Sequence, residues 1–333
     1  MTLKKFIFAM LAGVTFGFSP ARADTSGQQL AVDAGRSLIG TPAPPVVLTT
    51  IDGERIDLGS LYGRKAVYLK FWATWCVPCR QQMPHFERTY ERAGQELAVI
   101  AVNAGFDDSL AEVKTYRQTL GLKMPIVIDD GQLADELHLR VTPQHIVIGR
   151  DGRIAYIGHL VDDRLEEALK LAVKAPPAKL DQSARTSKAS VGIAANAPMP
   201  DTLIKTIDGK QLTLRDPAGK QMTALVFLSP WCESYLQSSR PERARACKRA
   251  REQTELLAAH SGMRWVGIAS GLWATTQDLE SYQKDNQVTI PLTLDDTGAL
   301  FRQFAVRDVP TLIVLDPKGH VVRRADEVSI DAS

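Results

Sequence analysis

Two cysteines, separated by two residues, are the side chains in this sequence with the clearest chemistry. Cys76 and Cys79 lie in the stretch WCVPC at residues 75–79, directly after an apolar run at residues 66–72 that is rich in Val and aromatic residues. That run predicts a buried strand, followed by a helix that begins at the first cysteine. The free N–H groups and the dipole of a helix N-terminus favour negative charge, so we expect the Cys76 thiol to ionise readily.

The spacing also gives the second cysteine a part in the chemistry. Cys79 lies one helical turn deeper, within disulfide reach, and can attack a mixed disulfide that Cys76 has formed. A structural zinc site would need four ligands, and the sequence has no second CxxC and no suitably spaced histidine pair. A purely structural disulfide is the other alternative, but a strand followed by a helix is typical of a reactive dithiol. We expect redox chemistry without a metal or a cofactor.

The first 23 residues have the pattern of a secretory signal. Two lysines precede an apolar run at residues 6–18, and the small residues Ala21 and Ala23 predict cleavage before Asp24. The apolar run is short for a membrane span, and no later run is long enough to be one. We therefore expect an exported protein with no stable membrane span after cleavage. A bacterial periplasm, where disulfides persist, is the natural setting.

Composition and charge narrow the class of protein further. The chain has 333 residues, 44% of them hydrophobic, and only four cysteines, so buried cores must stabilise it, most simply in two domains. The net charge of +2 gives no reason to expect a nucleic-acid partner.

Residues 39–173 alternate between predicted strands and helices, which indicates an α/β fold with a central mixed sheet flanked by helices. Before them, residues 25–36 are polar and small, and we expect a loose lead-in. After them, residues 174–198 are rich in Ala, Pro and Ser without an aromatic residue, which is typical of a linker. Besides a hairpin at Asp52-Gly53, we expect strands at 97–103, 125–128, 145–148 and 154–157, and helices at 109–120, 132–137 and 162–173.

The chain then repeats itself over residues 199–333. The stretch TIDG at residues 50–53 returns at 206–209, and Trp75-Cys76 returns as Trp231-Cys232 at the same spacing. Pro143 returns as Pro310 at a wider spacing, so residues have been inserted, mostly just after Cys232. Two copies of one domain are the simplest explanation.

The first copy resembles the exported TlpA/ResA-like thiol–disulfide oxidoreductases of the thioredoxin superfamily. The resemblance rests on the N-terminal hairpin, FWATWCVPC at residues 71–79, Met83-Pro84 and Val141-Thr142-Pro143. It implies tandem thioredoxin-like domains, the second divergent, and catalysis by Cys76 and Cys79.

Four neighbours of the cysteines take supporting roles by the same resemblance: Trp75, Pro78, Thr142 and Pro143. Pro143 is expected to be a cis-proline that presents backbone to an extended substrate segment beside the dithiol. In the second copy, Pro310 keeps the corresponding position.

Two departures from the family pattern leave the proton acceptor of Cys79 open. Lys70 stands where thioredoxins carry an acid, and Gln82 stands where many TlpA/ResA-like proteins carry Glu. Neither is as ready a general base as a carboxylate, so water or a deprotonated Lys70 remain as acceptors. We expect the Lys70 side chain to reach solvent along its apolar stem.

The second copy has Tyr235 where the second cysteine would return, and another cysteine, Cys247, inside the insert. One continuous helix would place the Cys232 and Cys247 thiols roughly 22 Å apart, at about 1.5 Å per residue. Pro241 disfavours continuity, and SRPE at residues 239–242 fits a capping box that restarts a helix. A disulfide between Cys232 and Cys247, which would be a possible second redox pair, and two independent cysteines both remain open.

The charged and titratable residues elsewhere are interpreted as structural. The insert carries six basic residues against three glutamates, which favours a solvated helix face over an anionic docking face. His85, His145 and His159 have neither metal-ligand nor catalytic-triad spacing. The basic residues are Arg240, Arg243, Arg245, Lys248, Arg249 and Arg251.

The resemblance favours a reducing role, for example in the maturation of cytochrome c or of a metal-site protein, while the oxidising direction stays open because it depends on the reduction potential. It implies protein disulfides or dithiols as substrates and a membrane or periplasmic thiol reductant as electron donor. Two other functions are considered: a redox-silent binding or docking protein, and a thiol peroxidase. A peroxidase would need a Thr-x-x-Cys arrangement, whereas Thr74 lies only two residues before Cys76.

Overall fold

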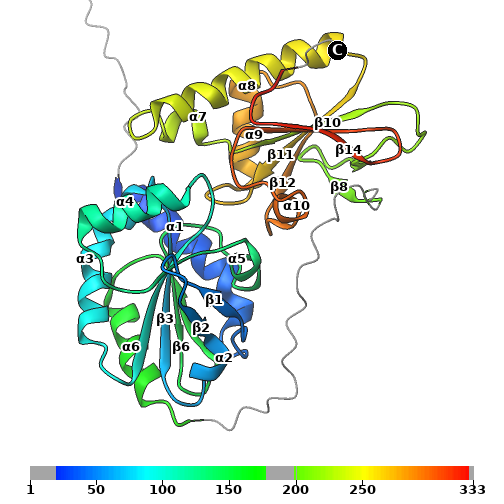
Figure 1. Ribbon diagram of the computed structural model, residues 1–333. Helices are drawn as coiled ribbons and strands as arrows, with labels where there is room; N and C mark the ends of the chain where they lie inside the picture. The colour runs from blue at the N-terminus through cyan, green and yellow to red at the C-terminus, as the bar shows by residue number, and fades with distance from the viewer. Residues whose placement is uncertain (1–19, 178–198, 200, 330–333) are drawn as a thin grey trace, which may run out of the picture.

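The first domain is built on β3 (Ala66–Trp72), the middle strand of a five-stranded sheet (Figure 1). The computed structural model describes residues 20–177, 199 and 201–329. β3 runs parallel to one neighbour and antiparallel to the other, so the sheet is mixed, as predicted. In the order β5-β4-β3-β6-β7, the other strands are β4 (Leu97–Asn103), β5 (Ile126–Ile128), β6 (Gln144–Ile148) and β7 (Ile154–Gly158).

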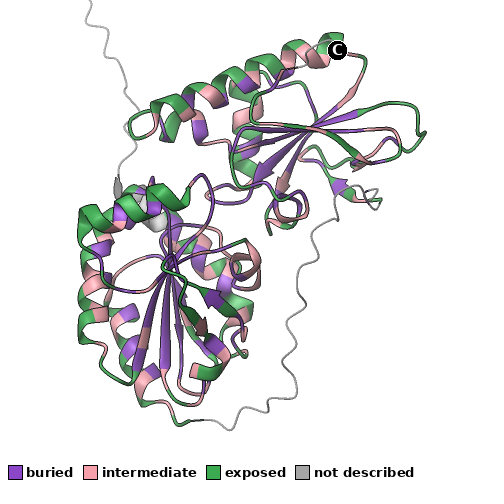
Figure 2. Cartoon of the chain, in the orientation of Figure 1, coloured by how far each residue is buried: buried purple, intermediate pink, exposed green. Residues whose placement is uncertain are grey.

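Helices cover both faces of this sheet, and every residue of β3 is buried (Figure 2). Tyr68 and Trp72 point into an apolar cluster with α3, α4 and α6, whereas Leu69 and Phe71 point into one with α2, α5 and the N-terminal hairpin. A strand enclosed in this way shows no alternation of polar and apolar residues. The bounds are β1 (Val47–Thr49), β2 (Arg55–Asp57), α2 (Leu58–Leu61), α3 (Val77–Arg92), α4 (Leu110–Leu120), α5 (Gln132–Glu136) and α6 (Asp163–Lys174).

These bounds confirm the strands and helices predicted within residues 39–173 to within two residues. Local signals explain the agreement, because Ser109 and Glu112 form a capping box at the start of α4 and Asp162 caps α6. The limits predicted for the two domains stay predictions. Most of the predicted signal and almost all of the linker lie outside the described residues.

The expected loose lead-in is wrong, because residues 20–35 form helix α1 (Pro20–Gly35), followed by a short 3-10 helix η1 (Arg36–Leu38). α1 packs on β7. The Gln28 side-chain oxygen accepts hydrogen bonds from the backbone N–H groups of His159 (2.7 Å) and Leu160 (3.0 Å). At Gly35 an added Cβ would lie 2.7 Å from the Ile157 side chain, so the helix lies close against the strand. Tertiary packing orders a segment whose composition alone does not predict a helix.

The second domain repeats the architecture of the first. Its sheet has the order β12-β11-β10-β13-β14, and β10 pairs parallel with β11 and antiparallel with β13, as β3 does with its neighbours. The same fold therefore occurs twice in tandem. The elements are β8 (Leu203–Lys205), β9 (Gln211–Thr213), β10 (Thr223–Leu228), β11 (Arg264–Ser270), α9 (Thr276–Asp285), β12 (Leu292–Asp295), α10 (Ala299–Gln303), β13 (Thr311–Leu315) and β14 (Val321–Ala325).

The chain from Cys232 onward, which contains the insert, forms α7 (Cys232–Tyr235) and α8 (Pro241–His260). α8 restarts at Pro241, where a proline is tolerated because its missing N–H would have no helical partner. The capping box expected from residues 239–242 is wrong. Arg240 is the N-cap residue and no side chain caps the helix.

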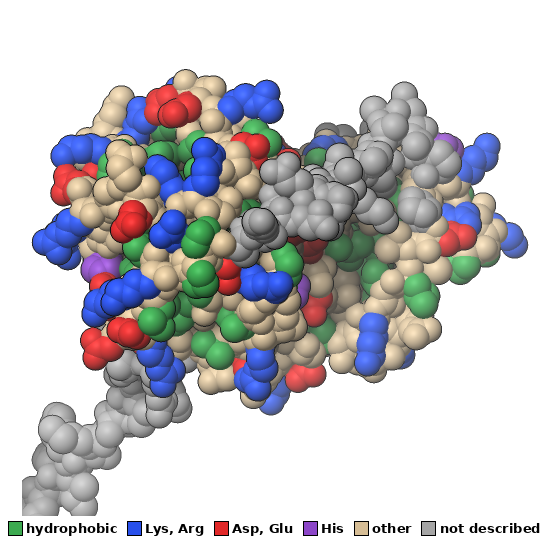
Figure 3. Space-filling model, turned by 90° about the horizontal axis from the view of Figure 1, so that it is seen from below, with side chains coloured by type: hydrophobic (Ala, Val, Ile, Leu, Met, Phe, Trp, Pro, Cys, Tyr) green, Lys and Arg blue, Asp and Glu red, His purple; other side chains and the backbone are tan. Residues whose placement is uncertain are grey.

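The second domain lies against one end of the first domain's sheet (Figure 1), and one apolar cluster contains residues of both domains. On the face seen in Figure 3, acidic and basic side chains are interspersed, in keeping with the small net charge. Within the described part of the chain, no helix has both the length and the apolar character needed to span a bilayer.

The docking of α1 gives a testable prediction. Gln28→Ala removes the acceptor of two backbone N–H groups, and an unsatisfied buried polar group costs about 1–3 kcal/mol. We expect thermal or urea unfolding, followed by circular dichroism, to show a lower free energy of unfolding. Gln29→Ala is the matched control, because Gln29 is exposed and its side chain bonds to Asp33 within α1. Equal stabilities of the two variants would contradict the docking of α1.

Candidate active site

The dithiol lies at the turn from β3 into α3. Cys76 is the N-cap residue of α3, and the backbone N–H of Cys79 lies 3.2 Å from the Cys76 sulfur, which accepts its hydrogen bond. The two sulfurs are joined in a disulfide, and the side chains are 1% and 0% exposed. Pro78 lies in the first turn of the helix, where its missing N–H leaves no bond unmade. A Cys76 thiolate at this position would face the positive end of the helix dipole.

A cis-proline loop faces the first cysteine. The Thr142–Pro143 bond is cis, as the resemblance implies, and the Cys76 sulfur lies 3.2 Å from the Thr142 carbonyl oxygen. After reduction, a thiol at Cys76 can donate to this carbonyl. Thr142 is buried, and the Pro143 carbonyl accepts a hydrogen bond from His159 Nδ1 at 2.7 Å, which fixes the loop. The arrangement places a backbone edge beside the reactive sulfur, where an extended peptide can pair with it.

A second loop, which follows β4, supports the turn before Cys76. Trp75 donates its indole N–H to the Phe106 carbonyl (2.9 Å) and is 3% exposed. The carboxylate of Asp108 accepts hydrogen bonds from the Thr74 N–H (2.8 Å), the Thr74 hydroxyl (2.6 Å) and the Asn103 side-chain amide (2.7 Å). Burial raises the pKa of Asp108, and these donors oppose that rise.

Lys70 is fully buried beneath the helix that carries the dithiol, so the expectation that it reaches solvent is wrong. Its Nζ lies 5.5 Å from the centre of the Phe86 ring and has no hydrogen-bond partner among the described residues. Burial lowers the pKa of Lys70 to about 7. The physical reason is the position of β3, because a side chain on a central strand with both faces covered has no path to water. The amine can therefore be neutral near neutral pH.

Gln82 belongs to a buried hydrogen-bond network. Its side-chain nitrogen donates to the His159 carbonyl (3.2 Å), which orients the amide so that its oxygen lies 2.8 Å from His145 Nε2. Burial holds the pKa of His145 well below its usual value, so the ring is neutral. Nε2 then carries the proton, and Nδ1 accepts from the Tyr68 hydroxyl at 2.8 Å. Gln82, Tyr68 and His145 thus satisfy one another, and Gln82 is not available as a base.

The other two cysteines are bonded to each other in the second domain. Cys232 begins α7, Cys247 lies in α8, and the break at Pro241 lets the chain fold back so that their Cα atoms are 6.3 Å apart. The Val309–Pro310 bond is also cis, and the Cys247 sulfur lies 3.9 Å from the Val309 carbonyl oxygen. The second disulfide therefore lies against a cis-proline loop, as the first does, with one sulfur supplied by the insert.

Residues of the second domain complete the surroundings of the first dithiol, and the sequence reasoning missed them. The Tyr235 hydroxyl accepts a hydrogen bond from the Val77 N–H (3.0 Å), and Trp231 packs on Trp75 with ring centres 5.0 Å apart. The Trp273 indole N–H donates to the Thr142 hydroxyl at 3.2 Å. The only available signal was the repeat itself, since Trp231-Cys232 and Trp75-Cys76 occupy corresponding positions.

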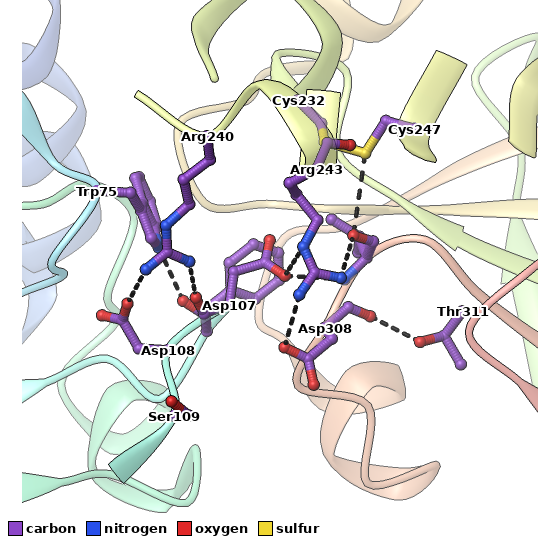
Figure 4. Close-up of polar contacts among 12 residues, drawn as sticks. Trp75, Asp107, Asp108, Ser109, Cys232, Arg240, Arg243, Cys247, Asp308 and Thr311 are labelled. Carbon is purple, nitrogen blue, oxygen red and sulfur yellow. Dashed lines mark hydrogen bonds and ion pairs between the residues drawn. A yellow bond between two sulfur atoms is a disulfide. The ribbon is translucent and has the colours of Figure 1, made fainter. Parts of the chain in front are cut away.

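Two arginines of the insert also contact the first domain (Figure 4). Arg240 pairs with Asp108 at 2.8 Å, and Arg243 lies 3.5 Å from a carboxylate oxygen of Asp107. Burial raises the pKa of Asp107 to about 7, although the Arg243 charge opposes this. The prediction of a solvated helix face therefore fails at Arg240 and Arg243. It describes Arg245, which is exposed and pairs with Glu242 within α8.

The comparisons with known proteins concern the first domain. The AhpC/TSA family model matches residues 39–157. Thiol-disulfide oxidoreductase ResA of Bacillus thuringiensis (strain Al Hakam) is 34% identical over 142 residues, covering 41% of this chain and 80% of that protein. The chain belongs to the ResA-like thiol–disulfide oxidoreductase family. ResA of Halalkalibacterium halodurans is 38% identical over 144 residues, with the same coverage of 41% and 80%.

Among solved structures, a thiol:disulfide interchange protein of the thioredoxin family from Chlorobium tepidum TLS is similar to the first domain. It is 28% identical, with a TM-score of 0.35, over 40% of this chain and 97% of that one. As a member of the ResA-like family, the protein is a thiol–disulfide oxidoreductase with its CxxC motif at Cys76 and Cys79. In the described part of the chain, no group of three or more His, Cys, Asp or Glu side chains could hold a metal ion.

Lys70 gives a prediction about pH. Its pKa is about 7 in the folded protein and 10.5 as a model value, so between these limits the unfolded chain binds more protons. The free energy of unfolding should therefore rise with pH across this window, and below it the buried amine costs on the order of a few kcal/mol. Lys70→Met should lose this part of the rise and be more stable than the parent at pH 6.5, in urea unfolding at a series of pH values. Lys114→Met, at an exposed position, is the control. The same rise in Lys70→Met and in the parent would show that Lys70 is not the group responsible.

Proposed function

We propose that the protein is exported to the periplasm and there reduces disulfides in other proteins through Cys76 and Cys79. One observation carries the proposal: Cys76 combines the N-cap position of α3 with a contact to the carbonyl that precedes a cis-proline. The helix terminus favours its thiolate, and the loop beside it can hold a substrate segment.

The reaction is thiol–disulfide exchange in two steps. The Cys76 thiolate attacks one sulfur of the substrate disulfide, forming a mixed disulfide and releasing the other substrate sulfur as a thiolate. The Cys79 thiolate then attacks Cys76, so the substrate leaves as a dithiol and Cys76–Cys79 becomes the disulfide. The substrate gains two electrons, and a membrane or periplasmic thiol reductant restores the pair. A neutral Lys70 or water takes the proton of Cys79, because the neutral carboxamide of Gln82 is not a base.

Four residues support the exchange. Trp75, held by its indole N–H, braces the turn before the reactive cysteine, and Pro78 starts the helix that stabilises the thiolate. Thr142 and Pro143 form the edge against which the substrate backbone lies. The attack on the substrate and the release of the substrate therefore take place at the same face of the first domain.

Export rests on the sequence pattern, and the reducing direction rests on the resemblance to the TlpA/ResA-like family. The signal-like start of the chain and two disulfides fit an oxidising compartment. We propose protein disulfides as substrates, for example in the maturation of cytochrome c or of a metal-site protein, and a thiol reductant as the partner that supplies electrons.

The roles of the two cysteines can be separated by substitution. Cys79→Ser should stop after the first step, because no second thiol releases the substrate, and should accumulate a mixed disulfide through Cys76. Mass spectrometry after incubation with a disulfide-containing peptide detects that adduct. In Cys76→Ser, the remaining Cys79 should form no mixed disulfide with the peptide. This variant should no longer reduce either the peptide or a small aromatic disulfide. Undiminished reduction by Cys76→Ser would show that Cys76 does not carry the reaction, and the proposed function would fail.

A further inference from the structure

The face of the first domain that a substrate must reach is occupied in this structure by the second domain. The Val77 N–H, beside Cys76, donates to the Tyr235 hydroxyl, and the hydroxyl of Thr142 accepts from Trp273. The indole of Trp75 packs against Trp231. Cys76 itself is only 1% exposed. Groups on each side of the reactive sulfur are therefore already bound.

Buried ion pairs hold this arrangement together. Arg240 contacts Asp108, whose side chain is 0% exposed (Figure 4). It also lies 3.0 Å from Glu112 and donates to the Thr74 hydroxyl at 2.6 Å. Arg243 lies against Asp107, whose side chain is also 0% exposed. Separating the domains would leave these carboxylates without their charged partners. The basic residues that interrupt the repeat are thus complementary in charge to the loop beside the dithiol.

The Cys232–Cys247 disulfide encloses three of the residues that contact the first domain. Tyr235, Arg240 and Arg243 all lie in the loop of chain that it closes, between the start of α7 and the middle of α8. A disulfide reduces the conformational freedom of the loop it closes, so it keeps the three side chains in one arrangement. The Arg243 guanidinium also donates to the Val309 carbonyl, against which the Cys247 sulfur lies.

We propose that the second domain is a cap that docks on the substrate-binding face of the first, and that the Cys232–Cys247 disulfide holds the cap's contact segment in its docking shape. Reduction of that disulfide by a dithiol consumes two electrons and two protons, yields two thiols and oxidises the dithiol to its disulfide. The contact segment then loses its constraint, the cap releases, and Cys76 becomes accessible to a protein. This proposal rests on the proposed function, because covering Cys76 has a consequence only if Cys76 reacts with protein disulfides.

The accessibility of Cys76 tests the cap without any turnover. In the full chain with Cys79→Ser, Cys76 is the one free thiol while Cys232–Cys247 stays bonded. We would compare its rate of alkylation by a bulky polyethylene-glycol maleimide with its rate of alkylation by iodoacetamide. The ratio of the two rates separates access from the intrinsic reactivity of the thiolate.

Adding Arg240→Ala to this chain should raise the bulky-to-small rate ratio by about ten-fold or more, because one partner of a buried ion pair is lost. Arg245→Ala, on the exposed side of α8, is the matched control and should leave the ratio unchanged. Tyr235→Phe, which removes only the hydroxyl bonded to Val77, should give a smaller rise and keeps the test valid if Arg240→Ala folds poorly. An unchanged or lower ratio in Arg240→Ala and Tyr235→Phe would overturn the cap.

A separate experiment tests the role of the Cys232–Cys247 disulfide. In the Cys79→Ser chain, Cys232→Ala with Cys247→Ala should raise the same ratio as Arg240→Ala does, with circular dichroism confirming that the chain is folded. A folded double variant with the parental ratio would show that the disulfide does not hold the cap. If the ratios change as expected but Cys76→Ser still reduces disulfides, the cap stands and the proposed function fails.

Discussion

The enclosure of β3 on both faces is the constraint on which the rest of the first domain depends. Helices cover each face of the strand, so neither face is open to solvent. The strand leads into the turn that places Cys76 at one end of the sheet, at the start of α3. The same enclosure makes Lys70 a buried amine that has no hydrogen-bond partner in the described part of the chain. The side chains along β3 are buried, so the reactive group of this region, Cys76, lies just beyond the end of the strand.

Two loops converge on that end, and each has a separate physical role. The cis-proline loop supplies a carbonyl oxygen 3.2 Å from the Cys76 sulfur. The loop after β4 supplies Asp108, whose carboxylate binds the Thr74 backbone and side chain and so fixes the turn before the cysteines. The sulfur is therefore next to backbone groups, whereas the charged Asp108 does not touch it and instead holds the turn that precedes the cysteines.

The second domain binds to the charged groups of that loop. Arg240 binds the carboxylate that braces the Thr74 turn, so the docking of one domain and the local order of the other share a single group. The interface also has an apolar part, in which Trp75 and Phe106 pack on Trp231. Residues at which the second copy diverges take part in this contact. The Tyr235 side chain, at the position of a second cysteine, bonds to the first domain, and Cys247 replaces that cysteine as the partner of Cys232.

The sequence by itself determined the dithiol, the order of strands and helices in the first domain and the existence of a second copy, because spacing, capping residues and apolar runs are local signals. It did not predict α1, which is ordered by the bonds of Gln28 to the backbone just after β7 and by the packing of Gly35 on β7. Nor did it predict the burial of Lys70 or the docking of Arg240, since each depends on what lies opposite in space. Residues distant in the sequence meet only in the folded chain, and those contacts decide the environment of Cys76.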